Sequence, residues 1–335
     1  MGLNAISSAL LKGIYHSFKG MSVICYLDKE INERKQNRHS PTIRQKHIER
    51  EPSPHPHQRK QEDSKVIHKV LQCATLNGGI FLASVFVFEC LLLPSLNKFF
   101  SVLFGSDAFV TMVVWSWIEY IVLLVYRSFW LVPLFFLSRV INAFWFQDIA
   151  DSAYRYSRGR PVAFPSISEL FADSIFSIFV QFLFLLQASL TSYIPIYPVG
   201  YILYVVQMSL LYSLYSFEYK WFNMGWKLHE RLAFIENHWP YFVGFGLPLT
   251  IFTQLSDSWV VSGCVFSILF PFFILSGNEA SPVTDASDIH LQLFTPVIAV
   301  ANTFFSKIIG NNKHIPSAAT NANTMPQQTS RLNRR

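Results

Sequence analysis

Charged side chains are scarce in this sequence. Asp, Glu, Lys and Arg make up 14% of its 335 residues, whereas roughly a quarter is usual in a soluble domain. Apolar residues reach 51%, with 32 phenylalanines, and they are grouped into separate blocks. This composition argues against an ordinary soluble domain and is typical of helices that lie in a membrane.

Motifs of catalysis and metal binding are also lacking. The four cysteines, which have no metal-binding or redox spacing, are Cys25, Cys73, Cys90 and Cys264. His229 and His238 lie nine residues apart, whereas the zincin pattern needs two histidines one helical turn apart. No nucleophile elbow, phosphate-binding glycine loop or haem motif occurs. We therefore predict no enzyme activity, no metal and no cofactor.

Excess basic charge is confined to one part of the chain. Residues 1–76 hold 13 of the 27 Lys and Arg residues but only 7 of the 21 acidic residues, and the rest of the chain is balanced. The net charge of +6 therefore describes a basic arm and not a nucleic-acid-binding surface. Such an arm attracts anionic lipid headgroups and marks the cytosolic side. The predicted partner is the cytosolic face of the bilayer, and no nucleic acid is expected.

The segments outside the apolar blocks differ in character. Residues 1–27 place apolar side chains at helical spacing, which predicts an amphipathic helix on the membrane or on the rest of the protein. Residues 28–70 are polar, charged and proline-bearing, and predict a disordered cytosolic linker. Residues 290–309 predict an amphipathic or packed helix, and residues 310–335 a disordered tail.

Six apolar blocks predict the membrane domain, within residues 71–280. The approximate spans are 78–96, 115–140, 171–193, 199–217, 241–256 and 259–276. Short turns join the last four blocks in two pairs, so each pair predicts a tight helical hairpin. The predicted fold is an all-α integral membrane protein with about six transmembrane or partly inserted helices, plus amphipathic surface helices.

Two blocks do not match the thickness of a bilayer. The apolar run from Val113 to Phe146 would be about 51 Å long as a helix, and the hydrocarbon layer is about 30 Å thick. It must tilt, kink at Pro133 or protrude, and the polar sequence that follows favours protrusion. The block from Tyr241 to Leu255 would span only about 22 Å. Two glycines and a proline interrupt it, so partial insertion is an alternative to a full span.

Basic residues in the loops predict the orientation. One set of loops carries Arg155, Arg158, Arg160, Lys220, Lys227 and Arg231, and the opposite set carries only Lys98. Because Lys and Arg concentrate on the cytosolic side, both chain ends are predicted to be cytosolic.

The stretch "SFEYKWFNMGWKLHERL", residues 216–232, combines aromatic and charged side chains. On a helical wheel one side is apolar and the other carries Lys220, Asn223, Lys227, Glu230 and Arg231. We predict that the fourth span leaves the bilayer near Glu218 and continues as an amphipathic helix along the cytosolic surface.

A few charged residues are candidate functional groups. Glu89 falls near the middle of the first span, where an isolated charge costs about 2.5–3.5 kcal/mol. Arg127 is nearest in depth, so the pair predicts an intramembrane salt bridge or a transport site. Asp148 and Asp151 share one helical face, which suits either acid–base or cation chemistry, or a solvated helix end. The predicted cytosolic contact surface comprises Asp148, Asp151, Lys220, Lys227 and Arg231.

Long stretches of unusual composition resemble a known family. They include "LPLFFLSRVINAFWFQDIAD", "SGCVFSILFPFFILSGNEA", "LQCATLNGGIF" and "VWSWIEY", within about Leu71 to Ala280. They are similar to the etoposide-induced protein 2.4 family and, more distantly, to bacterial sulfate permeases of the cysteine-biosynthesis operon. The resemblance implies a multi-pass endoplasmic-reticulum membrane protein required for autophagy, at the formation of degradative autolysosomes, with links to growth suppression and apoptosis. It supplies no catalytic residue.

Two functions remain open at this point. The first is a non-enzymatic membrane factor that acts in autophagy through cytosolic contacts with protein partners. The alternative is a membrane transporter or channel for a small anion, because short Gly- and Pro-interrupted membrane segments often form transport sites. A lipid-handling protein is a third option that the basic surface helices allow.

Overall fold

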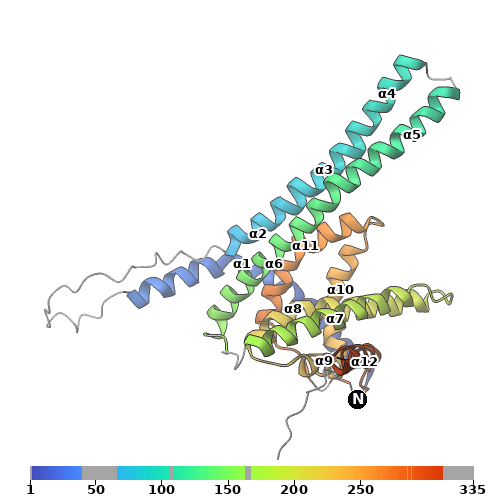
Figure 1. Ribbon diagram of the computed structural model, residues 1–335. Helices are drawn as coiled ribbons and strands as arrows, with labels where there is room; N and C mark the ends of the chain where they lie inside the picture. The colour runs from blue at the N-terminus through green and yellow to red at the C-terminus, as the bar shows by residue number, and fades with distance from the viewer. Residues whose placement is uncertain are drawn as a thin grey trace, which may run out of the picture.

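The computed structural model describes residues 2–39, 66–105, 109–162, 167–284, 286–287 and 289–311, and every regular element in these ranges is a helix (Figure 1). Helix α1, Leu3–His39, extends beyond the predicted boundary at residue 27. The predicted linker is thus helical at both ends, since α2 begins at Val66. Residues 40–65 and most of the predicted tail lie outside the described ranges.

The longest feature is a hairpin with two extended helical arms (Figure 1). The first arm comprises α2 Val66–Ala74, η2 Thr75–Leu82, α3 Ala83–Phe86, η3 Val87–Leu92 and α4 Leu93–Phe104. The second comprises α5 Phe109–Tyr126, η4 Arg127–Leu131 and α6 Val132–Ser157. The apolar helical runs within the arms contain 38 and 45 residues, so they are about 57 and 68 Å long. Both arms are therefore much longer than a bilayer is thick.

Stacked rings and one amide pair fix the register of this hairpin. Phe88 stacks on Tyr126 with ring centroids 3.6 Å apart. Nearer the start of the first arm, buried Asn77 and Asn142 exchange two amide hydrogen bonds of 3.1 Å. Because buried amides are costly to leave unpaired, this exchange favours one alignment of the arms.

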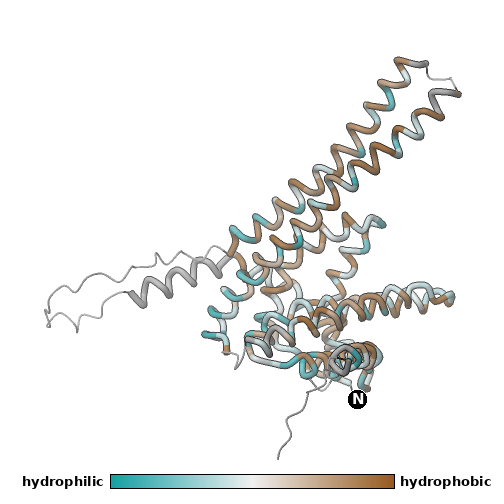
Figure 2. Tube along the Cα trace, viewed as in Figure 1, coloured by the Kyte–Doolittle hydropathy of each residue, from teal (hydrophilic) through white to brown (hydrophobic). Residues whose placement is uncertain are grey.

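The two predicted tight hairpins are present. One joins α7, Ile167–Thr191, to α8, Val199–Asn223, and the other joins α10, Trp239–Thr253, to α11, Trp259–Glu279. Figure 2 shows apolar residues along both hairpins and along the outer part of the long hairpin. Among the described residues, five helices are long and apolar enough to cross a membrane, and α10 is not one of them. The prediction of an all-helical protein with several membrane helices is confirmed.

Helix α1 is packed tightly against α10 and α11. A Cβ on Gly13 or on Gly244 would overlap the backbone of the opposite helix. Ser276 Oγ on α11 donates to the Ser17 carbonyl and accepts from the Gly20 N–H, both at 2.6 Å. Of the two locations left open for the N-terminal helix, the structure shows the one on the protein.

Two short helices complete the described fold. Helix α9, Leu228–Asn237, follows α8, and α12, Thr295–Asn311, lies against α7 (Figure 1). The α7–α12 contact is aromatic, since Phe179 meets Phe304 and Phe305 with ring centroids 5.0 and 5.3 Å apart.

Candidate functional site

The stretch that follows Ser216 is not one continuous helix. Helix α8 ends at Asn223, and Gly225 adopts a left-handed φ of 79°. The N–H of Trp226 donates to the Trp221 carbonyl at 3.0 Å, as in a Schellman motif. The prediction of a single amphipathic surface helix is therefore wrong. The glycine was the available signal, because glycine adopts this conformation without a steric cost.

The turn at Gly225 directs Arg231 into the protein. Its side chain is only 1% exposed, and its Nη2 lies 3.0 Å from Asp173 Oδ2. Its Nη1 lies 3.2 Å from Glu218 Oε1. Its Nε and Nη2 also donate to the Trp226 carbonyl, at 2.9 and 2.6 Å. One guanidinium thus joins α7, α8 and the turn before α9.

The two carboxylates have further partners. Glu218 accepts hydrogen bonds from Ser177 and, at 2.6 Å, from Gln181 Nε2, both on α7. Asp173 accepts from the Leu228 N–H at 3.2 Å, at the first residue of α9. This polar cluster has one cation and two acids, and nearly all its oxygens and N–H groups are used within the protein. It is arranged to hold three helices together.

Lys220 forms a second buried contact at the same end of the protein. Its side chain is largely buried, and Nζ donates to the carbonyls of Ala280 and Gly277 at 2.6 and 3.2 Å. These carbonyls lie at the end of α11, where the helix dipole favours a cation. Lys220 and Arg231 are therefore structural groups, and the structure removes both from the predicted contact surface.

The two aspartates of α6 are engaged separately. Asp151 accepts from Asn223 Nδ2 at 3.2 Å and from Gln147 Nε2 at 2.9 Å. Asp148 is exposed and lies 2.6 Å from Lys69 Nζ. The two carboxylates do not act on a common centre. Within the described ranges, no group of three His, Cys, Asp or Glu residues could hold a metal ion.

Exposed charges lie at the C-terminal end of α6 and at the start of α9. Lys227, a residue of the predicted contact surface, is exposed. Three further exposed cations lie at or beyond the end of α6, namely Arg155, Arg158 and Arg160. Figure 2 shows this end of α6 as hydrophilic. The exposed polar surface at this end thus includes Asp148, Lys227 and the three arginines.

Glu89 and Arg127 do not form an ion pair. Both side chains are exposed. The residue before each of them, Phe88 and Tyr126, fills the contact between the arms. Because Phe88 stacks on Tyr126, Glu89 and Arg127 lie at similar positions along the two arms. Their side chains, however, are exposed and do not lie between the arms.

Burial shifts the pKa of His16 and of Glu236, which lie outside the membrane-crossing helices. Burial lowers the pKa of His16, and the positive charges of Lys19 and Lys12 lower it further. Burial raises the pKa of Glu236, although hydrogen bonds from the Phe294 and Thr295 N–H groups oppose this. The Glu236 carboxylate accepts from the Phe294 N–H at 2.7 Å and so fastens α9 to the segment before α12.

The fold and the buried contacts of Arg231 and Lys220 define a class: an all-helical, multi-pass membrane protein in which buried charged groups join helix ends. The chain belongs to the family described as "Sulfate transporter CysZ/Etoposide-induced protein 2.4", which matches residues 61–275. The family resemblance in the sequence is thereby confirmed. The match begins after α1 and ends before α12.

Named relatives agree with this assignment. The chain is 35% identical over 151 residues to "Ectopic P granules protein 4" of Caenorhabditis elegans, covering 45% of this chain and 48% of the relative. It is 30% identical over 248 residues to "Protein EI24 homolog" of Arabidopsis thaliana, covering 65% and 76%. The Dictyostelium discoideum "Protein EI24 homolog" is 27% identical over 278 residues, covering 81% and 85%. The chain thus matches about half the length of the nematode protein. No solved structure matches.

Proposed function

We propose that this protein is a non-enzymatic factor of the endoplasmic-reticulum membrane that autophagy requires when degradative autolysosomes form. Family membership carries this proposal. The relative named "Ectopic P granules protein 4" supports it, because its name refers to granules in an abnormal place, as a failure to degrade them would produce. In this proposal both chain ends are cytosolic, and loss of the protein also affects growth suppression and apoptosis.

The proposed protein contact surface is the exposed polar end of α6 and α9. Its members are Asp148, Arg155, Arg158, Arg160 and Lys227, all exposed. The buried cluster around Arg231 supports the proposal because it fixes α7, α8 and α9 relative to one another. A partner would meet a rigid surface, which lowers the ordering cost of binding.

Complementation of cells that lack the protein tests both parts. We expect wild-type protein to restore the lysosomal degradation of autophagic cargo. A variant with Arg155, Arg158, Arg160 and Lys227 changed to Gln should insert normally and fail to restore it. A control with Lys12, Lys19 and Lys98 changed to Gln should restore it. Normal degradation in the deficient cells would reject the function, and full rescue by the first variant would reject the surface.

A small-anion transporter is the second candidate function. The family description includes a sulfate transporter, and α10 is short and contains Gly244, Gly246 and Pro248. However, a Cβ on Gly244 would overlap Leu10, and one on Gly246 would overlap Ser209. These glycines serve close helix packing, so we expect no sulfate flux above that of empty liposomes. Flux that is lost in Arg127→Gln would establish the transporter instead.

A further inference from the structure

Arg139 on α6 is a cation without an anionic partner. Its Cζ lies 5.0 Å from the ring centroid of Phe135 and 6.0 Å from that of Phe266 on α11. Among the described residues, no carboxylate pairs with it and no oxygen accepts a hydrogen bond from it, and the residue is exposed. A guanidinium has five N–H donors, so this one is available to an acceptor from outside the chain.

Gly263 leaves room for the guanidinium between α6 and α11. A Cβ at this position would stand 3.3 Å from Arg139 Nη2. The faces of Phe135 and Phe266 attract the cation and orient it. The neighbouring residues Phe136, Leu137 and Val140 of α6 are apolar and exposed. The result is an oriented cation at the edge of an apolar, outward-facing surface.

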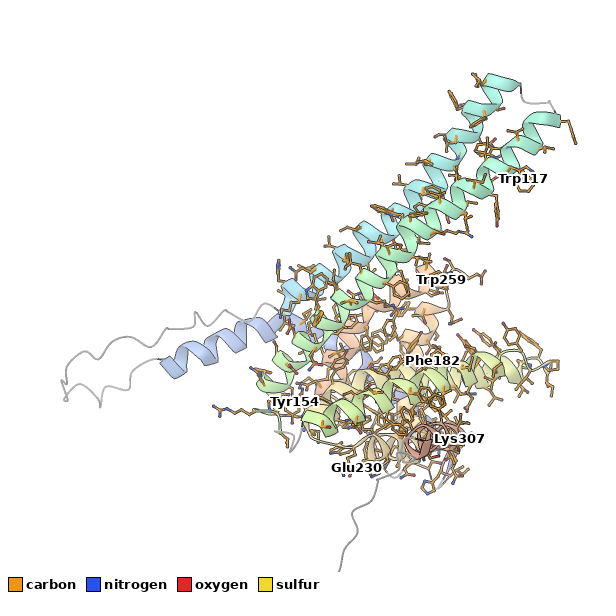
Figure 3. The ribbon with its side chains drawn as sticks, in the orientation of Figure 1. Trp117, Tyr154, Phe182, Glu230, Trp259 and Lys307 are labelled. Atoms are coloured by element: carbon orange, nitrogen blue, oxygen red, sulfur yellow. The ribbon has the colours of Figure 1, made fainter. Side chains whose placement is uncertain are left out.

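The spacing of charges places Arg139 at one boundary of the hydrocarbon layer. From Glu119 to Arg139 the second arm rises about 30 Å, the thickness of that layer. Between these two residues only Arg127 is charged. Exposed Trp117 (Figure 3) and Tyr120 flank Glu119, as aromatic residues do at a membrane boundary. Arg139 then lies at the opposite boundary, at the depth of lipid phosphates.

The position of the α10–α11 hairpin is consistent with Arg139 at the membrane boundary. Trp259, the first residue of α11 (Figure 3), lies with its ring centroid 5.1 Å from that of Phe135. Phe135 lies one helical turn before Arg139, so it is nearer the middle of the hydrocarbon layer than Arg139. The α10–α11 hairpin therefore turns inside the layer, which agrees with the partial insertion suggested by the length of α10. Arg139 lies beside the point where this hairpin would enter.

We propose that Arg139 binds the phosphate of a phospholipid at the contact between α6 and α11. Arginine matches phosphate oxygens with two parallel N–H···O bonds. The acyl chains would lie along the exposed apolar side chains of α6. An anionic lipid should bind better than phosphatidylcholine, because the choline group adds a cation beside the guanidinium.

Native mass spectrometry of the full-length protein tests the proposal. The probes are dioleoylphosphatidylserine and dioleoylphosphatidylcholine, added to detergent-purified protein. We expect retention of one phosphatidylserine with at least roughly tenfold preference over phosphatidylcholine. Arg139→Gln should lose that lipid, because one charged hydrogen-bonded contact is worth about tenfold or more in affinity. Arg155→Gln is the matched control, an exposed arginine of the same helix that should keep the lipid.

A second variant and a competition experiment complete the test. Gly263→Ala should weaken retention while Arg139 stays intact, so the proposal remains testable if Arg139→Gln does not fold. Equal retention by wild type, Arg139→Gln and Gly263→Ala would overturn it. Inorganic sulfate or phosphate alone should not displace the lipid. Displacement by either ion at the same concentration as phosphatidylserine would show a site for free oxyanions and would also overturn it.

Discussion

Arg231 and Glu218 lie thirteen residues apart in the sequence and meet inside the protein, with Nη1 3.2 Å from Oε1. The contact spans the turn at Gly225, so it forms only when α9 folds back on α8. Asp173 brings α7 into the same contact. Some of the charged residues that the sequence placed on an exposed surface therefore form buried contacts between helices instead.

The first prediction concerns this cluster. Arg231→Leu should destabilise the protein by about 2–3 kcal/mol, because it leaves two partly buried carboxylates without their cation. Lys227→Ala, an exposed change four residues earlier, should shift stability by no more than about 0.5 kcal/mol. Thermal unfolding in detergent measures both. Similar melting temperatures for the two variants would contradict the assigned role of Arg231.

The second prediction concerns the turn itself. Gly225→Ala should cost about 1–2 kcal/mol, because its φ of 79° is strained for a residue with a Cβ. The control is Gly79→Ala, where a Cβ would make an ordinary contact with Thr75. Unfolding curves should show a loss for the first variant and none for the second. An unchanged melting temperature in Gly225→Ala would mean that the turn does not limit stability.

The elements that the sequence predicted best are those set by length and composition. Blocks of apolar residues joined by short turns can only return as hairpins, so the α7–α8 and α10–α11 hairpins were predictable. The shortness of α10 was visible in the same way. Burial of Arg231 was not, because a helical wheel assumes that the helix continues through Gly225.

The direction of side chains was harder to predict than their depth. Glu89 and Arg127 lie in the π-helical segments η3 and η4. A π-helical turn is wider than an α-helical turn, so side-chain directions depart from the usual 100° step. Phe88 and Tyr126 take the contact between the arms instead. The position of Arg139 was not predictable from its local sequence, because Phe266 and Gly263 on α11 are more than a hundred residues away.

The third prediction concerns the packing of α1 against α10. Gly13→Val should displace α1 from α10, because even a Cβ overlaps the backbone near Tyr241 and Phe245. We expect faster protease cleavage within α1 and a lower melting temperature. Leu11→Val changes an exposed position of the same helix and should leave both unchanged. Equal cleavage rates in the two variants would show that α1 does not need this close crossing.

The last prediction concerns pH. Neutral His16 Nδ1 lies 2.8 Å from the Tyr241 hydroxyl and can accept its hydrogen bond. Because the folded-state pKa of His16 is lowered from 6.5, the unfolded chain binds this proton more readily. Its contribution to stability is therefore present above about pH 6.5 and decreases as the pH falls below that value.

Melting curves between about pH 5 and 8 test this sign, with His16→Gln as the comparison, because glutamine cannot gain the proton in this range. The wild type should lose more stability than the variant on acidification, and the difference should level off near neutral pH. A matched pair of Lys12→Gln variants, with and without His16→Gln, should show a smaller difference, since Lys12 contributes to the lowered pKa. A wild type that gains stability relative to His16→Gln on acidification would reverse the sign and exclude a neutral His16 as the partner of Tyr241.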